Sequence, residues 1–262
     1  KLGWIRTPLK TPEPTFEPGI WIDLKHDAIQ KINYHGIKKC WQQGNELLGE
    51  GYKAEILSVH DPDEYIAQAN TDKEKAEKMM DIVEAYLALS ELKTKGKASA
   101  IGVGAKDWHI IREVSKHIRL DWAMLAVSLT VMHHPPDLLE FIEELGNKGV
   151  GVINSAVFHS GFLAGSEFFD YRRTNRSDPE DQARFAWREK FFSICSKYKI
   201  NPAAACVQFG MSPKGVVSIA LNTSRPDRIR ENVELVQVRI PDGFWKAMKE
   251  EGLIRQDYPF LG

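Results

Sequence analysis

The chain has 262 residues, of which 43% are hydrophobic and 10% aromatic, and its 35 Lys and Arg are balanced by 36 Asp and Glu. This composition predicts a globular protein with a substantial core, and the balanced charge excludes a field built to attract nucleic acid or anionic lipid. No apolar run approaches the roughly 20 residues of a membrane span, and three widely spaced cysteines favour a reducing, cytoplasmic compartment over a disulfide framework.

Short apolar segments alternate with longer amphipathic ones along the whole chain. In chain order we expect a strand at Leu2–Ile5, a long loop at Thr7–Tyr34, a helix at Ile37–Leu48, a strand at Glu55–Val59, a helix at Lys75–Lys93, a strand at Ala98–Val103 and a helix at Trp108–His117. There follow a strand at Ala123–Ser128, a helix at Pro136–Asn147, a strand at Gly149–Ala156, a loop at Ser160–Pro179, helices at Asp181–Tyr198 and Pro202–Phe209, a strand at Val216–Leu221 and a helix at Pro226–Val233. Most of the strands are apolar nearly throughout, as strands buried on both faces are.

This alternation predicts an α/β fold with a parallel sheet, formed by one domain over residues 1–262. A closed (β/α)8 barrel needs eight strands, so about six predicted strands indicate a barrel that is incomplete at its N-terminus. The start of the chain has no Met, which favours a fragment whose first two units precede Lys1. A doubly wound open sheet accommodates six strands too, but its glycine-rich fingerprint should follow an early strand. Gly102-Val103-Gly104 lies mid-chain and lacks the third glycine, so the barrel is favoured.

A group of polar residues follows the second predicted strand, where barrel enzymes place active-site side chains. This group is His60-Asp61-Pro62-Asp63-Glu64. His60 there can hydrogen-bond or protonate a substrate oxygen, alone or together with Asp61 or Asp63. Equally, one of the two aspartates caps the next helix and His60 only lies nearby. The pair His133-His134 is expected to belong to a turn, and the histidines lack the spacing of metal ligands, so no metal site is predicted.

Two later loops are suited to bind phosphate. Phe158–Gly165 contains small residues whose backbone N–H groups can approach an anion, although an ordinary glycine-containing loop has the same composition. The last predicted strand leads through Asn222–Arg228 into a helix, and hydroxyls and arginines at such a position also attract phosphate. Two such loops in adjacent units predict a dinucleotide site.

These segments resemble the aldo-keto reductases, and within them the aldose 1-dehydrogenases acting on L-fucose, D-threo-aldoses and L-galactose. The resemblance is carried by His60–Glu64, Phe158–Gly165, Phe185–Arg188, Pro202–Gly210, Ala220–Pro226 and Arg228–Asn232. It covers essentially the whole chain. It implies a (β/α)8 barrel and hydride transfer to or from NAD or NADP without a metal.

The resemblance also implies two catalytic residues. His60 matches the family histidine that orients the reacting oxygen. Lys1 matches the family lysine that lowers the pKa of the proton-transferring tyrosine. The family's Asp and Tyr fall before Lys1, so no residue of this chain is assigned to either role.

The resemblance implies more residues for cofactor binding than for catalysis. The residues implied are Ser160, Gly161 and Leu163 for the pyrophosphate, Arg228, Glu231 and Asn232 for the adenine end, and Asn222 with Thr223 where NADP-specific members carry a lysine. Without that lysine NAD is favoured over NADP, although Arg225 or Arg228 could compensate. The nicotinamide end departs from the family, because Gly104-Ala105 replaces its Ser-Asn pair.

The resemblance therefore predicts an NAD(P)-dependent oxidoreductase that oxidises an L-fucose-like sugar at its anomeric hydroxyl. Trp21, in the long loop at residues 7–34, is expected to cover the sugar, with Asp61 beside it; Trp21 could equally anchor the loop. The alternative is a non-catalytic, truncated or degenerate barrel that binds nucleotide or acts as a scaffold. The oligomeric state stays open.

Overall fold

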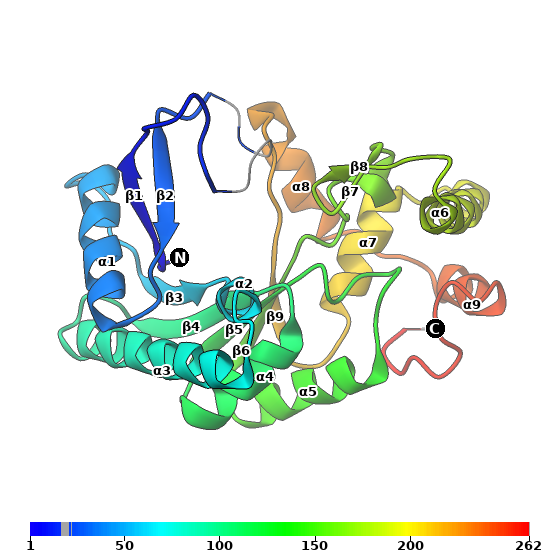
Figure 1. The fold of residues 1–262 in the computed structure, drawn as a ribbon. Coiled ribbons are helices and arrows are strands. Elements are labelled where there is room, and N and C mark those ends of the chain that lie inside the picture. Colours follow the sequence, from blue (N-terminus) through cyan, green and yellow to red (C-terminus); the bar gives the residue numbers. More distant parts are fainter. Residues whose placement is uncertain (17–20, 22, 262) are drawn as a thin grey trace. The chain divides into compact units, whose positions relative to one another are not determined.

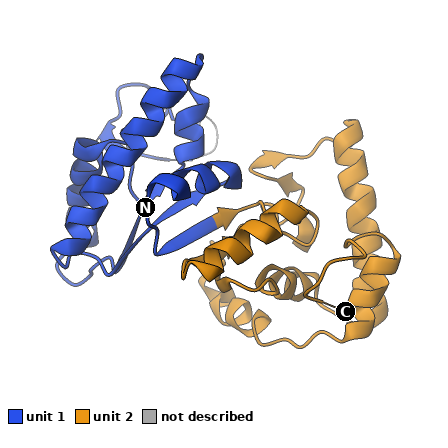
Figure 2. Cartoon of the chain, turned by 90° about the horizontal axis from the view of Figure 1, so that it is seen from below, with its two compact units in different colours: residues 1–124 blue, residues 125–262 orange. Residues whose placement is uncertain are grey.

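The computed structural model describes residues 1–16, 21 and 23–261. The chain forms two compact units, residues 1–124 and 125–262, which Figure 2 shows in two colours. Strand β5 (Trp122–Ala126) crosses from the first unit into the second. No helix in the described part of the chain is both long and apolar enough to cross a bilayer.

Unit 1 is built on parallel strands covered by helices. Its elements are β1 (Trp4–Pro8), β2 (His26–Gln30), α1 (Tyr34–Leu48), β3 (Ile56–His60), α2 (Pro62–Ala67), α3 (Asp72–Thr94), β4 (Ala100–Ala105) and α4 (Trp108–His117), followed by the start of β5. The strand order is β3-β4-β5, and β3 pairs with β4 in parallel from Ile56↔Ala100 to His60↔Gly104. Helix α3 packs against β3, β4 and α1 (Figure 1).

The strand predicted at Leu2–Ile5 is wrong in extent. Leu2 alone pairs with β3, through a parallel bridge to Val59 in which Leu2 N–H donates to Ser58 O and His60 N–H to Leu2 O, both at 2.8 Å. The chain then changes direction at Gly3, whose φ of 130° is open to glycine and strained for other residues. Beyond Gly3, β1 pairs antiparallel with β2 instead.

The segment predicted as a long loop, residues 7–34, therefore contains a strand. Its residues 26–30 form β2, which pairs with β1 from Trp4↔Gln30 to Pro8↔His26. The connection between the two strands includes Trp21, whereas residues 17–20 and 22 lie outside the described residues.

Gly102 in β4 is required for packing. A Cβ added there would lie 2.4 Å from Cδ2 and O of Trp122 in β5. A contact that close cannot be relieved by a rotamer change, because one of the two atoms is backbone. Gly102 is thus explained by strand packing, in agreement with the interpretation that Gly102-Val103-Gly104 is not a nucleotide fingerprint.

Unit 2 continues the alternation of strands and helices. After the end of β5 it contains α5 (Pro136–Asn147), β6 (Gly151–Ser155), the 3-10 turn η1 (Phe162–Ala164), β7 (Phe168–Phe169), β8 (Arg172–Arg173), α6 (Pro179–Tyr198), α7 (Pro202–Met211), β9 (Val216–Ala220), the 3-10 turn η2 (Pro226–Arg228), α8 (Ile229–Leu235) and α9 (Asp242–Glu250). The strand order is β5-β6-β9, and β6 pairs with β9 in parallel. Helix α7 packs against β9, η1 and α8, and α6 packs against α7 and α9 (Figure 1).

Local side-chain signals explain where most of the helices begin. The caps of α1, α3, α4, α6 and α7 are Asn33, Thr71, Asp107, Asp178 and Asn201, and each side chain accepts a hydrogen bond from a backbone N–H of the first turn. Helices α4 and α5 have the predicted bounds. Helices α2 and α9 and the strand pair β7–β8 were not predicted.

Candidate active site

One pocket of about 650 Å³ lies in unit 2, around the loops that follow β6 and β9. It is lined by Val127, Ala156, Phe158, Ser160, Gly161, Ala164, Tyr171, Asn201, Ala203, Asn222, Thr223, Ser224, Arg228, Glu231, Asn232 and Leu235. In a parallel α/β fold, ligands bind beyond the carboxyl ends of the strands, which is where both loops stand.

The loop after β6 has a backbone suited to hold an anion. His159, Ser160 and Gly161 are three consecutive residues with positive φ, at 48°, 56° and 86°. Among the described residues, the backbone N–H groups of Ser160 and Gly161 donate no hydrogen bond, so both remain available to a ligand of the pocket that they line. Unpaired N–H groups in such a turn form a concavity that attracts anions.

The loop after β9 supplies a positive charge to the pocket. Arg228 lines the pocket, and within the described residues no carboxylate lies at ion-pair distance from it. The neighbouring Arg225 is engaged, since its Nη2 lies 2.6 Å from Oδ2 of Asp227. The helix predicted at Pro226–Val233 is divided into η2 and the seven-residue α8, so the attraction for an anion comes from Arg228 itself rather than from a long helix.

Seven of the eight residues predicted to bind the cofactor line this pocket: Ser160, Gly161, Asn222, Thr223, Arg228, Glu231 and Asn232. The eighth, Leu163, is fully buried in η1 and is not among the residues that line the pocket. Six lining residues lie outside the two loops predicted to bind phosphate and were not anticipated as site residues: Val127, Ala156, Tyr171, Asn201, Ala203 and Leu235. The start of α7 at Asn201-Pro202 could have been found from the sequence, because an Asn followed by Pro is typical of a helix N-terminus.

A separate cluster lies in unit 1, at the end of β3. His60 Nε2 is 3.1 Å from Asp61 Oδ2, whereas His60 Nδ1 is buried and has no hydrogen-bond partner among the described residues. Burial, reinforced by the positive charges of Lys1 and Lys106, lowers the pKa of His60 to about 3. His60 is therefore a neutral imidazole at physiological pH.

Asp61 is held in an unusual backbone conformation. Its φ is 52°, although it is not a glycine; its N–H donates to Gly104 O at 3.0 Å, and its carbonyl accepts from Gln30 Nε2 at 3.1 Å. Burial, together with the negative charges of Glu64 and Asp63, raises the pKa of Asp61 to about 7. Strain and a shifted pKa at one position are typical of functional sites.

The possible capping roles of the two aspartates can now be compared. Asp61 occupies the position before α2 but makes no side-chain capping bond there. Asp63 Oδ2 instead accepts from the N–H groups of Lys106 and Asp107, at 3.0 and 2.9 Å, and so ties α2 to the loop after β4. Lys106 Nζ also lies 2.6 Å from Glu64 Oε1. Asp63 and Glu64 are thus engaged structurally, which leaves Asp61 to face His60.

The remaining predicted residues occupy different environments. Lys1 is exposed and precedes Leu2, whose carbonyl accepts from the N–H of His60. Trp21 is 52% exposed. His134 is buried, with Nδ1 3.3 Å from Thr130 O and its ring against Phe209. Over the described part of the chain, no group of three His, Cys, Asp or Glu is arranged to hold a metal ion.

Comparison with known proteins gives a family and a set of relatives. The model of the Aldo/keto reductase family matches residues 9–251. The chain is 28% identical over 254 residues to pyridoxal 4-dehydrogenase of Microbacterium luteolum, covering 94% of the chain and 70% of that protein. It is 26% identical to D-threo-aldose 1-dehydrogenase of Pseudomonas sp, covering 84% of the chain and 62% of that protein. It is 24% identical to NADH-specific methylglyoxal reductase of Escherichia coli (strain K12), covering 64% of the chain and 53% of that protein.

Two solved structures share the fold. An aldo-keto reductase from Bacillus halodurans in its holo form superposes with a TM-score of 0.62 at 15% identity, over 87% of this chain and 68% of that one. A thermostable aldo-keto reductase in complex with the inhibitor epalrestat gives a TM-score of 0.58 at 12% identity, over 84% and 67%. Together with the family match, these structures confirm the predicted barrel class of α/β fold.

Proposed function

The chain belongs to the aldo/keto reductase family, and we propose that it is an NAD(P)-dependent oxidoreductase that transfers a hydride between an aldose and a nicotinamide cofactor. One observation supports this most: residues expected to hold the two ends of a dinucleotide, from Ser160 to Asn232, line a single pocket. At about 650 Å³ the pocket falls in the range of small-molecule and cofactor sites.

The residues of the pocket fit a dinucleotide chemically. The unpaired N–H groups of Ser160 and Gly161 are donors for a pyrophosphate. Arg228 adds a positive charge, and Glu231 and Asn232 offer acceptors and donors to an adenosine. The two classes of contact that a nucleotide needs, charge for its phosphates and hydrogen bonds for its base and ribose, thus occur in one cavity.

When bound, the nicotinamide supplies the hydride chemistry. In our proposal the chain's own residues orient the substrate and manage the proton. His60, neutral and part of the cluster at the end of β3, hydrogen-bonds the reacting oxygen, and Asp61 accepts from a hydroxyl of the sugar. Lys1 places its positive charge beside the proton-transferring tyrosine that the family uses.

The substrate we propose is an aldose of the L-fucose type, oxidised at its anomeric hydroxyl to the lactone. The relative named D-threo-aldose 1-dehydrogenase supports a sugar. Trp21, with half of its surface exposed, offers an aromatic face against which the C–H side of a pyranose can pack. The relative named pyridoxal 4-dehydrogenase makes pyridoxal the first competing substrate to compare.

Within the proposal NAD is favoured over NADP. Asn222 and Thr223 line the pocket, and the resemblance implies a lysine at this position in NADP-specific members. Arg225, which could replace that lysine, pairs with Asp227. A reducing, cytoplasmic compartment fits the free and buried state of Cys40, Cys195 and Cys206.

A titration with NADH followed by a turnover assay tests the proposal. We expect NADH fluorescence to change on binding, and NADH to form from NAD⁺ on addition of L-fucose. The variant His60→Asn should bind NADH as the wild type does, yet lose activity about 10²- to 10⁴-fold, as expected for a residue assisting proton transfer. Binding without turnover for any aldose or for pyridoxal would favour the alternative, a barrel that holds nucleotide without catalysis. Absence of binding to both NADH and NADPH would overturn the proposal.

A further inference from the structure

The turn between β7 and β8 lies at the pocket and has a strained backbone. Its two central residues, Asp170 and Tyr171, both have positive φ, 43° and 70°. Such a two-residue turn favours Gly, Asn and Asp, and an aromatic residue there is costly. Tyr171 nevertheless lines the pocket, with 54% of its surface exposed. Something must therefore stabilise this turn.

Two contacts join the turn to the loop after β6. Asp170 Oδ1 lies 2.9 Å from His159 Nδ1, and Tyr171 N–H donates to Ser160 Oγ at 2.8 Å. The turn is thus fastened to His159 and to Ser160, and Ser160 is one of the two residues whose backbone N–H groups are available to an anion. Because Ser160 belongs to both, a shift of the turn would also move the phosphate-binding side of the pocket.

His159 connects the turn to the core. It is only 4% exposed, its Nε2 lies 2.9 Å from Oγ1 of the fully buried Thr130, and its ring stacks on Phe169 of β7 at 4.5 Å and 10°. A carboxylate opposite Nδ1 selects the tautomer with hydrogen on Nδ1, and Nε2 then accepts from the Thr130 hydroxyl. A neutral His159 satisfies both contacts at once.

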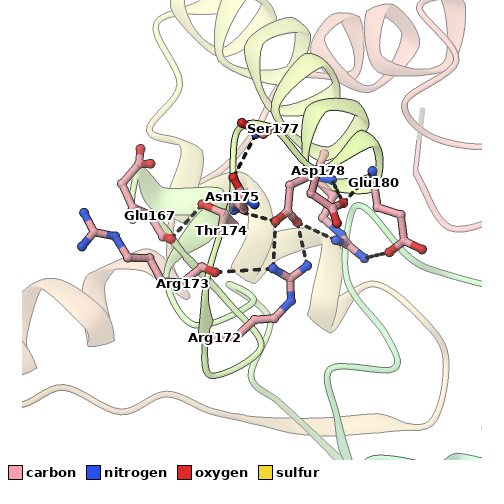
Figure 3. Close-up of polar contacts among 10 residues, drawn as sticks. Glu167, Arg172, Arg173, Thr174, Asn175, Ser177, Asp178 and Glu180 are labelled. Carbon is pink, nitrogen blue, oxygen red and sulfur yellow. Dashed lines mark hydrogen bonds and ion pairs between the residues drawn. The ribbon is translucent and has the colours of Figure 1, made fainter.

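The other end of the hairpin is fixed independently. Arg172 of β8 donates through Nη1 and Nη2 to the two carboxylate oxygens of Asp181 in α6, at 2.8 and 2.7 Å (Figure 3). The backbone N–H of Asn175 donates to the same carboxylate. The base of the hairpin is therefore held by contacts that involve neither Asp170 nor His159.

We propose that His159 is a positioning residue of the nucleotide site: through Asp170 it holds the β7–β8 turn so that Tyr171 closes one side of the pocket over the bound cofactor. The inference rests on the proposed function, since it assumes that the ligand of this pocket is a nicotinamide dinucleotide. Tyr171 supplies an aromatic face and the turn a wall, and the His159–Asp170 contact sets how long the cofactor remains bound.

The test measures NADH dissociation from the full chain by stopped-flow. We expect Asp170→Ala to raise both the dissociation rate and the Kd for NADH about tenfold. Asp170→Asn, whose amide oxygen still accepts from Nδ1–H, should restore most of the wild-type rate. Tyr171→Ala, which leaves the His159–Asp170 contact intact, should also release NADH faster. The matched control is Glu167→Gln, because Glu167 pairs with Arg176 and Arg188 at the hairpin but does not line the pocket.

The outcomes separate this inference from the proposed function. If the wild-type chain binds neither NADH nor NADPH, both are overturned. If the wild type binds NADH and both Asp170→Ala and Tyr171→Ala release it at the wild-type rate, the positioning role is overturned and the proposed function stands. If Asp170→Ala and Glu167→Gln change the rate equally, the effect belongs to the hairpin's general stability, and the assigned role of His159 is again wrong.

Discussion

The imidazole of His60 and the carboxyl group of Asp61 face each other at 3.1 Å, although the two residues are adjacent in sequence and follow a strand. In an extended chain neighbouring side chains point to opposite sides. The left-handed backbone of Asp61, at a φ of 52°, turns its carboxyl group back toward the histidine. The same pair has opposite pKa shifts, to about 3 for His60 and about 7 for Asp61. Near pH 5 the folded pair therefore holds one proton, on Asp61.

This pair should contribute little to the pH dependence of stability until one partner is removed. Near pH 5 the unfolded chain also holds one proton on the pair, on His60 instead of Asp61, so unfolding exchanges no net proton there. In Asp61→Asn, His60 alone takes up a proton on unfolding below pH 6.5. That variant should lose about 2 kcal/mol relative to the wild type between pH 6.5 and 4.5.

In the converse variant, His60→Asn, the stability should change with pH in the opposite direction. In His60→Asn, Asp61 alone remains; because its pKa is raised in the folded state, the stability it contributes is lost as pH rises from about 4 to about 7. His60→Asn should therefore gain stability relative to the wild type as pH falls from 6.5 to 4.5. Urea unfolding at several pH values measures both slopes. Parallel curves for the wild type and both variants would show that the two groups are not coupled in this way.

Arg228 should contribute more to cofactor affinity than the arginine two positions further on. We expect Arg228→Gln to weaken NADH binding about tenfold, because it removes a charge-assisted contact with a phosphate. Arg230→Gln is the matched control, since Arg230 lies in α8 two residues after Arg228, its side chain is 91% exposed and its Nε lies 3.8 Å from Glu234 Oε1. Equal losses in the two variants would mean that Arg228 acts through general charge and not through contact. Fluorescence titration at two salt concentrations distinguishes the two.

Adding a positive charge at position 222 should change the cofactor preference. Asn222→Lys adds a cation at the position where the resemblance implies a lysine in NADP-specific members. We therefore expect the ratio of NADPH to NADH affinity to rise about fivefold, the modest effect of an exposed ion pair. Asn147→Lys, with the same change of charge at an exposed residue outside the pocket, should leave the ratio unchanged. A ratio that does not respond to Asn222→Lys would place the 2′-position of the cofactor away from this residue.

Much of the fold could be predicted because its signals are local. Pro136 at the start of α5 and Asp107 before α4 mark those helices within the sequence itself, and both helices have the predicted bounds. The extent of the first strand could not be predicted in this way. Leu2–Ile5 is apolar throughout, but the direction of the chain changes at Gly3, and glycine alone does not reveal whether a φ of 130° is used.

The site residues also divide into those marked by a local motif and those placed by contacts that the sequence does not reveal. Ser160, Gly161 and Arg228 could be predicted because they belong to short motifs that border one pocket. Tyr171 could not, because its place depends on contacts between His159 and Asp170, eleven residues apart, across a turn that the composition of Ser160–Pro179 does not specify. Leu163 has the motif's position yet is buried, since within a 3-10 turn the sequence spacing does not determine which residue points inward.

The carboxylate of Asp181 should anchor the base of the β7–β8 hairpin. It has no exposed surface and accepts from Arg172, Arg184 and the N–H of Asn175 (Figure 3). The hydrogen bond from Arg172, followed by that from Asn175, lowers the pKa of Asp181 well below its ordinary value. The stabilising contribution of Asp181 is thus fully present above its unfolded pKa near 4 and is lost as pH falls further.

We expect Asp181→Asn to lower the midpoint of thermal unfolding by several degrees at pH 7. This deficit should shrink below pH 4. Glu180→Gln, which removes an exposed partner of Arg184, should stay close to the wild type at every pH. A deficit in Asp181→Asn that is constant from pH 7 to pH 3 would show that the side chain stabilises the hairpin by packing alone.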